Sequence, residues 1–142
     1  MYEYTCKVIR VVDGDTVDVD IDLGFGITYS NQRIRLLGID APESRTRDLA
    51  EKRFGILAKE FLENELRKAE ATGRLVIRTN VDEKGKFGRI LGEFFYEDED
   101  QMWVSINDVM IGQHHAVEYH GQSKAEIKKA HIKNREFLNE RI

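Results

Sequence analysis

The 142-residue sequence contains one cysteine, Cys6, and one proline, Pro42, and it has no hydrophobic run long enough to span a membrane. A single cysteine excludes an internal disulfide and a cysteine-based zinc site, so Cys6 is expected to be a small core residue. Residues 1–10, MYEYTCKVIR, lack the apolar stretch of a secretory signal, which predicts a cytoplasmic location. No repeat or low-complexity linker divides the sequence, so we expect one domain over residues 1–142.

The sequence also lacks a cationic excess. It has 22 Lys and Arg against 26 Asp and Glu, with a formal net charge of −4 at pH 7. This balance argues against a protein that holds duplex DNA by bulk positive charge. Nucleic acid remains possible as a substrate, because a local cationic pocket is enough to bind phosphate. We expect a monomer with no membrane partner.

The segment VVDGDTVDVDIDLG, residues 11–24, contains five aspartates within an alternating pattern. Such alternation is typical of a half-buried strand. The core-facing set is Val17, Val19, Ile21 and Leu23, and the solvent-facing set is Thr16, Asp18, Asp20 and Asp22. Asp13 and Asp15 share the parity of the apolar set, so their carboxylates are expected to point inward. An inward carboxylate needs a partner, because burying a bare charge is costly.

The order of the remaining elements predicts an α+β fold. Strands are expected over residues 4–12, 15–23, 33–39, 74–81 and 89–96, with a turn or bulge at 13–14 and a long hairpin connection over 25–32. Helices are expected from residue 54 to a stop at 72–73, near 105–113, and over 123–140, whereas 44–53 is a polar segment without a clear pattern. Five short strands with one helix after the third and two at the end indicate a five-stranded OB-fold β-barrel with about three α-helices.

The third strand ends in RIRLLGIDAPES, residues 33–44. Arg35 lies in the middle of this strand, where a guanidinium needs an anion. Antiparallel pairing with residues 15–23 brings Asp15 and Asp40 to the same rim of the barrel. Two neighbouring carboxylates share a proton or bind a cation, and oxygen ligands alone favour Ca²⁺ or Mg²⁺. An EF-hand is excluded, because DGDTVDVDID lacks the second acidic position and the glycine of that loop.

Glu43 and Arg89 complete this set of charged residues. Arginines clamp phosphate, a divalent ion neutralises phosphate oxygens, and a carboxylate can activate water. Together these residues are the parts needed for phosphodiester hydrolysis.

Four stretches, VIRVVDGDTV, IRLLGIDAPES, KRFGILAKEF and KFGRIL, resemble the staphylococcal nuclease (thermonuclease) family in order and spacing. The resemblance covers nearly the whole chain. It implies an OB-fold barrel with three helices and a Ca²⁺-dependent nuclease that cuts DNA and RNA to leave 3′-phosphate and 5′-hydroxyl ends. Single-stranded or frayed nucleic acid is the expected better substrate, because a small cleft reaches it more easily.

The resemblance also implies a role for individual residues. Asp15 and Asp40 look like the Ca²⁺ carboxylates, and Ala41 falls where the family offers a backbone carbonyl to the metal. Asp13 resembles an acid that lies beside the metal without binding it. Glu43 looks like the residue that positions or deprotonates the attacking water.

On the substrate side, Arg35 and Arg89 look like the phosphate-binding arginines that stabilise the transition state. Lys86, Phe87 and Tyr119 look like substrate-binding residues. Phe87 stands where the family often has a tyrosine, so stacking is kept and a hydroxyl is lost. The segment between Glu43 and Phe54 has the length of the family's mobile loop.

Several alternatives remain open. Arg35 and Arg89 also suit structural ion pairs with Asp40 or Glu43. The histidines of GQHHAVEYH suit either a second metal site or a solvated loop, at His114, His115 and His120. The basic face of residues 124–136 suits solvent or an approach to nucleic acid. The alternative function is a catalytically silent OB-type module that binds single-stranded nucleic acid or a protein.

Overall fold

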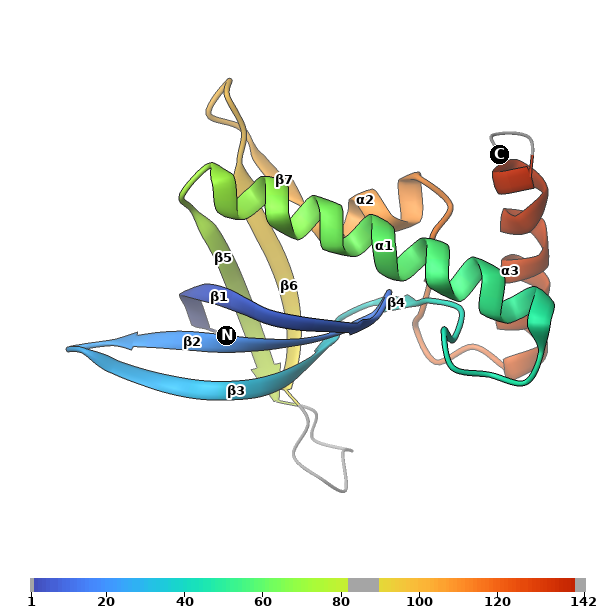
Figure 1. Ribbon diagram of the computed structural model, residues 1–142, viewed down its shortest axis with the longest axis horizontal. Coiled ribbons are helices and arrows are strands. Elements are labelled where there is room, and N and C mark those ends of the chain that lie inside the picture. The colour runs from blue at the N-terminus through green and yellow to red at the C-terminus, as the bar shows by residue number, and fades with distance from the viewer. Residues whose placement is uncertain (1, 82–89, 140–142) are drawn as a thin grey trace.

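The computed structural model describes residues 2–81 and 90–139, which form a closed barrel with helices packed on it (Figure 1). Strands β1 (Tyr2–Asp13), β2 (Thr16–Gly24) and β3 (Ile27–Leu36) form an antiparallel meander, and β5 (Leu75–Val81) pairs antiparallel with β6 (Ile90–Glu97). β1 also pairs with β5, and β3 runs parallel to β6. The parallel pair closes the sheet, which confirms the predicted five-stranded OB-type α+β barrel.

Three helices lie outside this barrel in the described part of the chain. They are α1 (Leu49–Ala71), α2 (Ile106–Gly112) and α3 (Lys124–Asn139). In Figure 1, α1 crosses over the barrel and α3 lies beside the first turns of α1. Short strands were not predicted: β7 (Trp103–Ser105) pairs with β6, and β4 (Ile39–Asp40) pairs with β8 (Val117–Glu118). No helix among the described residues is both long and apolar enough to cross a membrane.

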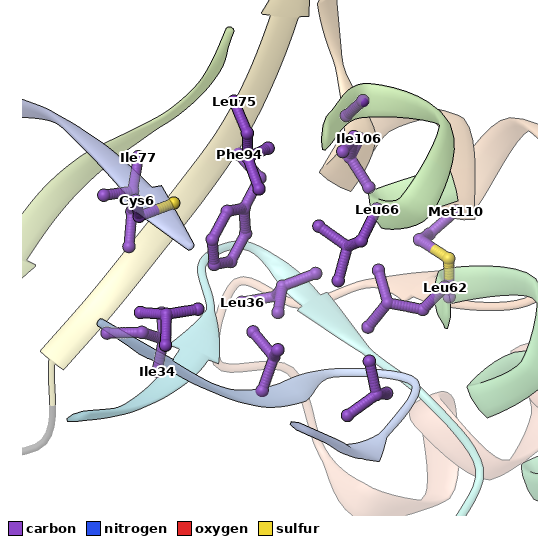
Figure 2. Close-up of a cluster of buried hydrophobic side chains, with 14 of the residues drawn as sticks. Cys6, Ile34, Leu36, Leu62, Leu66, Leu75, Ile77, Phe94, Ile106 and Met110 are labelled. Carbon is purple, nitrogen blue, oxygen red and sulfur yellow. The ribbon is translucent and has the colours of Figure 1, made fainter. Parts of the chain in front are cut away.

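The core fills the space between the barrel strands and α1 (Figure 2). α1 buries one stripe with near-helical spacing, formed by Phe54, Ala58, Leu62, Leu66 and Ala69. Val17, Val19 and Ile21 of β2 are buried as predicted, but Leu23 is 42% exposed because β2 extends beyond the helix-covered region. Cys6 is a core residue, and burial raises the pKa of its thiol to about 12.

The predicted long connection over residues 25–32 is wrong. β2 and β3 continue as a two-stranded ribbon to the pair Gly24↔Ile27, and the turn between them has positive φ at Gly24, Phe25 and Gly26. Glycine adopts this conformation at no steric cost, which permits the tight turn. The outer part of β3 is exposed on both faces, and its short alternation of Ile27 and Tyr29 with Thr28 and Ser30 gives way to the polar pair Asn31 and Gln32.

The predicted start of the first helix at residue 54 is also wrong. The helix begins at Leu49, and Asp48 is its N-cap: the Asp48 carboxylate accepts the backbone N–H groups of Ala50 and Glu51 at 3.1 and 3.2 Å. The first turn is mostly exposed and therefore carries no apolar stripe. The capping residue marked this boundary, whereas hydrophobic spacing did not.

Asp18 was predicted to face solvent, and this is wrong because it is only 6% exposed. Its carboxylate is covered by arginines from the two neighbouring strands, Arg33 Nε at 2.9 Å and Arg10 Nη2 at 3.1 Å. Hydrogen bonds from Arg33 and then Arg10 outweigh desolvation and lower the pKa of Asp18. The outer face of the meander therefore carries an ion cluster across three strands.

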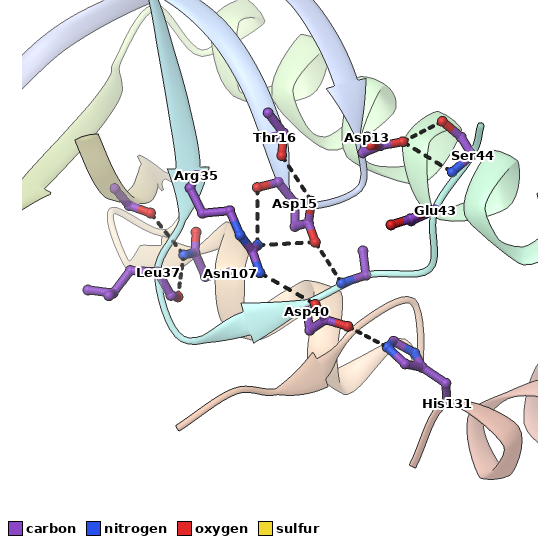
Figure 3. A network of polar contacts seen from close by, with 12 residues as sticks. Asp13, Asp15, Thr16, Arg35, Leu37, Asp40, Glu43, Ser44, Asn107 and His131 are labelled. Carbon is purple, nitrogen blue, oxygen red and sulfur yellow. Dashed lines mark hydrogen bonds and ion pairs between the residues drawn. The ribbon is translucent and has the colours of Figure 1, made fainter. Parts of the chain in front are cut away.

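Asn107 is a buried polar residue that links α2 to the barrel, and it is 2% exposed. Its Oδ1 accepts the backbone N–H of Phe94 at 3.2 Å. Its Nδ2 donates to the carbonyl oxygens of Leu37 at 2.9 Å and Gly92 at 3.1 Å (Figure 3). One side chain thus satisfies three backbone groups at the point where β3 meets β6.

We predict that Asn107→Ala lowers the free energy of unfolding by about 2–4 kcal/mol, because it leaves buried backbone groups without partners. Urea unfolding measures this change. Asn64→Ala is the matched control, since Asn64 is exposed on α1 and its side chain only accepts a bond from Arg67. Its effect should stay below about 0.5 kcal/mol. Equal losses in the two variants would contradict the role given to Asn107.

Candidate active site

The barrel places an arginine between two carboxylates at one rim. Asp15 lies in the turn between β1 and β2, Arg35 is near the end of β3, and Asp40 ends β4. Thr16 pairs with Arg35 across the β2–β3 ladder, and the Asp15 carbonyl accepts the Leu36 N–H at 2.8 Å. Strand register therefore brings Asp15 and Asp40 to one rim, as the sequence predicted.

Arg35 bridges the two carboxylates (Figure 3). Its Nη1 lies 3.1 Å from Asp15 Oδ2 and its Nη2 lies 3.5 Å from Asp40 Oδ1. The side chains of Asp15, Arg35 and Asp40 are 13%, 21% and 29% exposed, so solvent screens these charges only in part. The arginine reaches both acids because it stands at the rim where their strands converge.

Asp15 is the most constrained acid of this group. Its Oδ2 also accepts the backbone N–H of Ala41 at 2.9 Å, and its Oδ1 accepts the Thr16 hydroxyl at 3.0 Å. Burial nevertheless raises the pKa of Asp15 above its ordinary value, and the nearby charge of Asp40 raises it further. Arg35 and the two hydrogen bonds oppose this rise without cancelling it. Ionisation of Asp15 therefore lowers the stability of the folded state.

His131 of α3 is a member of the site that the sequence analysis missed. Its Nε2 lies 2.8 Å from Asp40 Oδ2, and its side chain is 11% exposed (Figure 3). The signal for it was helical spacing, because His131 lies one turn after Ile127 and two turns before the buried Leu138. Asp40 is thus held by a barrel arginine on one oxygen and by a helix histidine on the other.

Glu43 lies on the segment that leaves β4. Its carboxylate is exposed and makes no hydrogen bond or ion pair with the described residues, while its backbone N–H donates to Glu51 at 3.3 Å. Asp13 fixes the next residue, since its Oδ1 accepts both the backbone N–H and the hydroxyl of Ser44. Gly55 permits this packing, because a Cβ there would lie 2.1 Å from the Glu43 carbonyl oxygen. The Glu43 backbone is therefore fixed, whereas its carboxylate is exposed.

Two clefts meet at Asp40. The first has a volume of about 590 Å³ and is lined by Arg35, the 36–39 segment, Leu91 and the 119–121 segment. The second has a volume of about 740 Å³ and lies between the start of α1 and α3. Tyr119 lines both clefts and is 45% exposed, so its side chain is accessible beside Asp40.

The structure therefore brings Asp15, Arg35 and Asp40 into contact, with Ala41 bonded to Asp15. Asp13 is turned toward Ser44 and contacts neither Arg35 nor Asp40 in the described interactions. The remaining predicted site residues, Arg89, Lys86 and Phe87, lie outside the described residues.

The loop histidines have packing contacts. The His114 ring stacks on Phe137 with centroids 4.2 Å apart, and the His115 ring stacks on Phe61 at 4.5 Å. Over residues 2–81 and 90–139, no three His, Cys, Asp or Glu side chains are grouped as metal ligands. These contacts hold α3 and α1 against the segment before β8. The described residues give no support for a second metal site at these histidines.

Asp15 and Asp40 offer oxygen donors of the type that a hard cation prefers. Asp15 and Asp40 offer carboxylate oxygens, and Ala41 adds a backbone carbonyl on the same segment. Burial and, to a lesser extent, the charge of Asp40 raise the pKa of Asp15, and a bound cation would favour its ionised form. Two carboxylates form an incomplete shell, so water or substrate phosphate oxygens would supply the rest, as is common for Mg²⁺ sites and possible for Ca²⁺.

Comparison with known proteins agrees with this architecture. Residues 33–138 match the family described as staphylococcal nuclease homologues. The chain is 33% identical to a thermonuclease of Staphylococcus hyicus over 63% of this chain and 47% of that protein. It is 29% identical to a micrococcal nuclease of Shigella flexneri over 84% and 62% of the two chains.

An uncharacterised protein of Methanocaldococcus jannaschii is 30% identical over 96% of this chain and 65% of its own length. The chain thus spans between about half and two thirds of the length of these curated relatives. Because the family match covers most of the sequence, the chain belongs to the family of staphylococcal nuclease homologues. Membership suggests a nuclease-like function.

We predict that Asp15→Asn makes the protein more stable than the unchanged protein at pH 7. The pKa of Asp15 is higher in the folded state, so the folded state binds more protons and ionisation costs stability as pH rises. Asparagine has no such cost. The gain should disappear below the unfolded Asp pKa of about 3.9, where both states are protonated.

Urea unfolding at pH 7 and pH 3.5 measures this difference. Asp22→Asn, on the exposed end of β2, is the matched control. A loss of stability in Asp15→Asn at pH 7 would show that the bonds to Arg35 and Ala41 outweigh the burial of the charge.

Proposed function

We propose that this protein is a Ca²⁺-dependent nuclease that hydrolyses phosphodiester bonds of DNA, RNA or both. The observation that carries the proposal is the Arg35 guanidinium held between two partly buried carboxylates at the wall of an open cleft. Membership in the staphylococcal nuclease family supports the reaction class.

Each residue has a chemical task in this proposal. Asp15, Asp40 and the Ala41 carbonyl would hold the cation, which when bound neutralises phosphate oxygens. Arg35 lines the first cleft and would bind the phosphate and stabilise the charge of the transition state. The exposed Glu43 carboxylate would accept a proton from the attacking water. Arg89 is proposed as the second arginine, from sequence alone.

The products and the substrate preference are also proposals. In-line attack by water with loss of the 5′ oxygen gives 3′-phosphate and 5′-hydroxyl ends. A single strand is the preferred substrate, because the clefts on either side of Asp40 are small and open. Tyr119, together with Lys86 and Phe87, would contact the nucleotide.

We predict that Arg35→Ala and Glu43→Ala each lower kcat on heat-denatured DNA by about 10²–10³-fold, as when one preorganised charge or proton acceptor is removed from a site. The assay compares Ca²⁺, Mg²⁺ and chelator, and end analysis identifies the 3′-phosphate. Arg67→Ala and Glu60→Ala, on the exposed face of α1, are the matched controls.

Cleavage that needs Ca²⁺ and falls only in the two site variants would agree with the assigned roles. Binding of DNA without cleavage under any metal would favour a catalytically silent binding module. Cleavage that is unaffected in both site variants would place the active site elsewhere.

Cation binding has its own prediction. Ca²⁺ at 100 times its dissociation constant should raise the free energy of unfolding by about 2.7 kcal/mol, and chelator should reverse this. Asp40→Asn should abolish the increase, because it removes one of the two carboxylates. Thermal unfolding with a Ca²⁺ titration measures it, with Asp108→Asn on α2 as the control. An equal shift in Asp40→Asn would place the cation at another site.

A further inference from the structure

The second cleft has a cationic wall formed by one face of α3. Four residues on this face line it, namely Lys124, Lys128, His131 and Arg135. Their spacings of four, three and four residues place them on one side of a helix, and we call this set the α3 stripe. At 1.5 Å per residue the stripe is about 16 Å long, which is much longer than a single phosphate group.

The two lysines and the arginine of the α3 stripe lack anionic partners among the described residues, unlike the acids that face them. Asp48 caps α1, Glu51 accepts the Glu43 N–H, and Asp40 is bonded to Arg35 and His131. Within the described residues, by contrast, no ion pair involves Lys124, Lys128 or Arg135.

Arg135 is fixed in place although its charge is unpaired. Its guanidinium lies over the Phe54 ring at 5.4 Å from the centroid, and its Nε is buried with no hydrogen-bond partner among the described residues. A guanidinium held on an aromatic face keeps its position with its remaining donors unsatisfied. The cleft thus has unused cationic donors at both ends of the stripe.

The second cleft is continuous with the proposed active site. It shares Asp40 and Tyr119 with the first cleft, and His131 joins the α3 stripe directly to Asp40. One long ligand would therefore span both clefts, with one of its anions on the α3 stripe and a phosphate at Arg35. A ligand with anions at regular intervals along a chain matches this arrangement.

We propose that the α3 stripe binds the phosphodiester backbone of a single-stranded polynucleotide next to the bond that is cut. This inference rests on the proposed function and adds where the flanking phosphates bind. Lys124 and Lys128 contact these phosphates, and Arg135 closes the far end of the cleft. The strand then passes Asp40 and continues into the first cleft.

The test is the salt dependence of binding to a fluorescein-labelled single-stranded oligonucleotide of about 15 nucleotides, measured by anisotropy in chelator to prevent cleavage. The double variant Lys124→Gln/Lys128→Gln removes two phosphate contacts. The slope of log K against log salt should become shallower by about 1.4, which corresponds to about 25-fold weaker binding at 0.1 M salt. A dinucleotide should bind equally to both proteins, because it does not reach the stripe.

The matched control is Lys129→Gln/Lys133→Gln, which makes the same charge change on the same helix with the same spacing. Both lysines are exposed, and neither lines the cleft. The control should keep the slope of the unchanged protein. Circular dichroism checks that both double variants keep their helix content.

The outcomes separate this inference from the proposed function. Equal slopes in the two double variants, with denatured DNA still cut, would overturn the α3 stripe and leave the nuclease proposal intact. A reduced slope in the stripe variant alone would support the stripe even if no DNA is cut. No binding of the oligonucleotide by the unchanged protein at low salt would overturn the α3 stripe, and the cleavage assay in Ca²⁺ would then decide the nuclease proposal by itself.

Discussion

The contact of Arg35 with Asp15 and Asp40 is the interaction on which the rim of the barrel depends. Asp15 is mostly buried, and this burial raises the pKa of its carboxyl. Arg35 offsets part of this cost and also reaches Asp40, so one guanidinium makes it possible for two acids to stand together. Its position is set by barrel closure, since Arg35 pairs with Thr16 on one side and with Leu91 on the other. A slip of one residue in either ladder would turn the guanidinium to the opposite face.

The same ion pairs compete with the cation and the phosphate of the proposed function. A guanidinium that satisfies two carboxylates has fewer donors left for a phosphate, and carboxylates bound to an arginine are less available to a cation. A divalent ion between the acids and a phosphate on Arg35 would replace these contacts with stronger ones. In the proposed function the charges of this rim bind a cation and a phosphate, and sites of this kind commonly reduce stability in exchange for function.

The features that could be predicted are those that produce a local pattern in the sequence. Alternation in β2 and the helical stripe of α1 identified elements, the order of all the elements indicated the barrel, and antiparallel pairing placed Asp15 near Asp40. Asp18 was misjudged because its partners, Arg10 and Arg33, come from two other strands, and alternation cannot distinguish a solvated acid from one covered by long cations. His131 was missed because it meets Asp40 from 91 residues away in sequence. Helical spacing places His131 on the packed face of its helix, but no local pattern identifies Asp40 as its partner.

Helix α3 connects the acids of the rim to the surface around them. His131 bonds to Asp40, and the flanking cations on the same face line the cleft beside it. The helix is held by few core contacts: Leu138 is buried, the Phe137 ring stacks on His114, and Asn134 donates to the Ala116 carbonyl at 3.2 Å. A small displacement of α3 would therefore change the bond to Asp40 and the width of the cleft together. In this arrangement an anion bound along α3 and the position of Asp40 are linked through one rigid element.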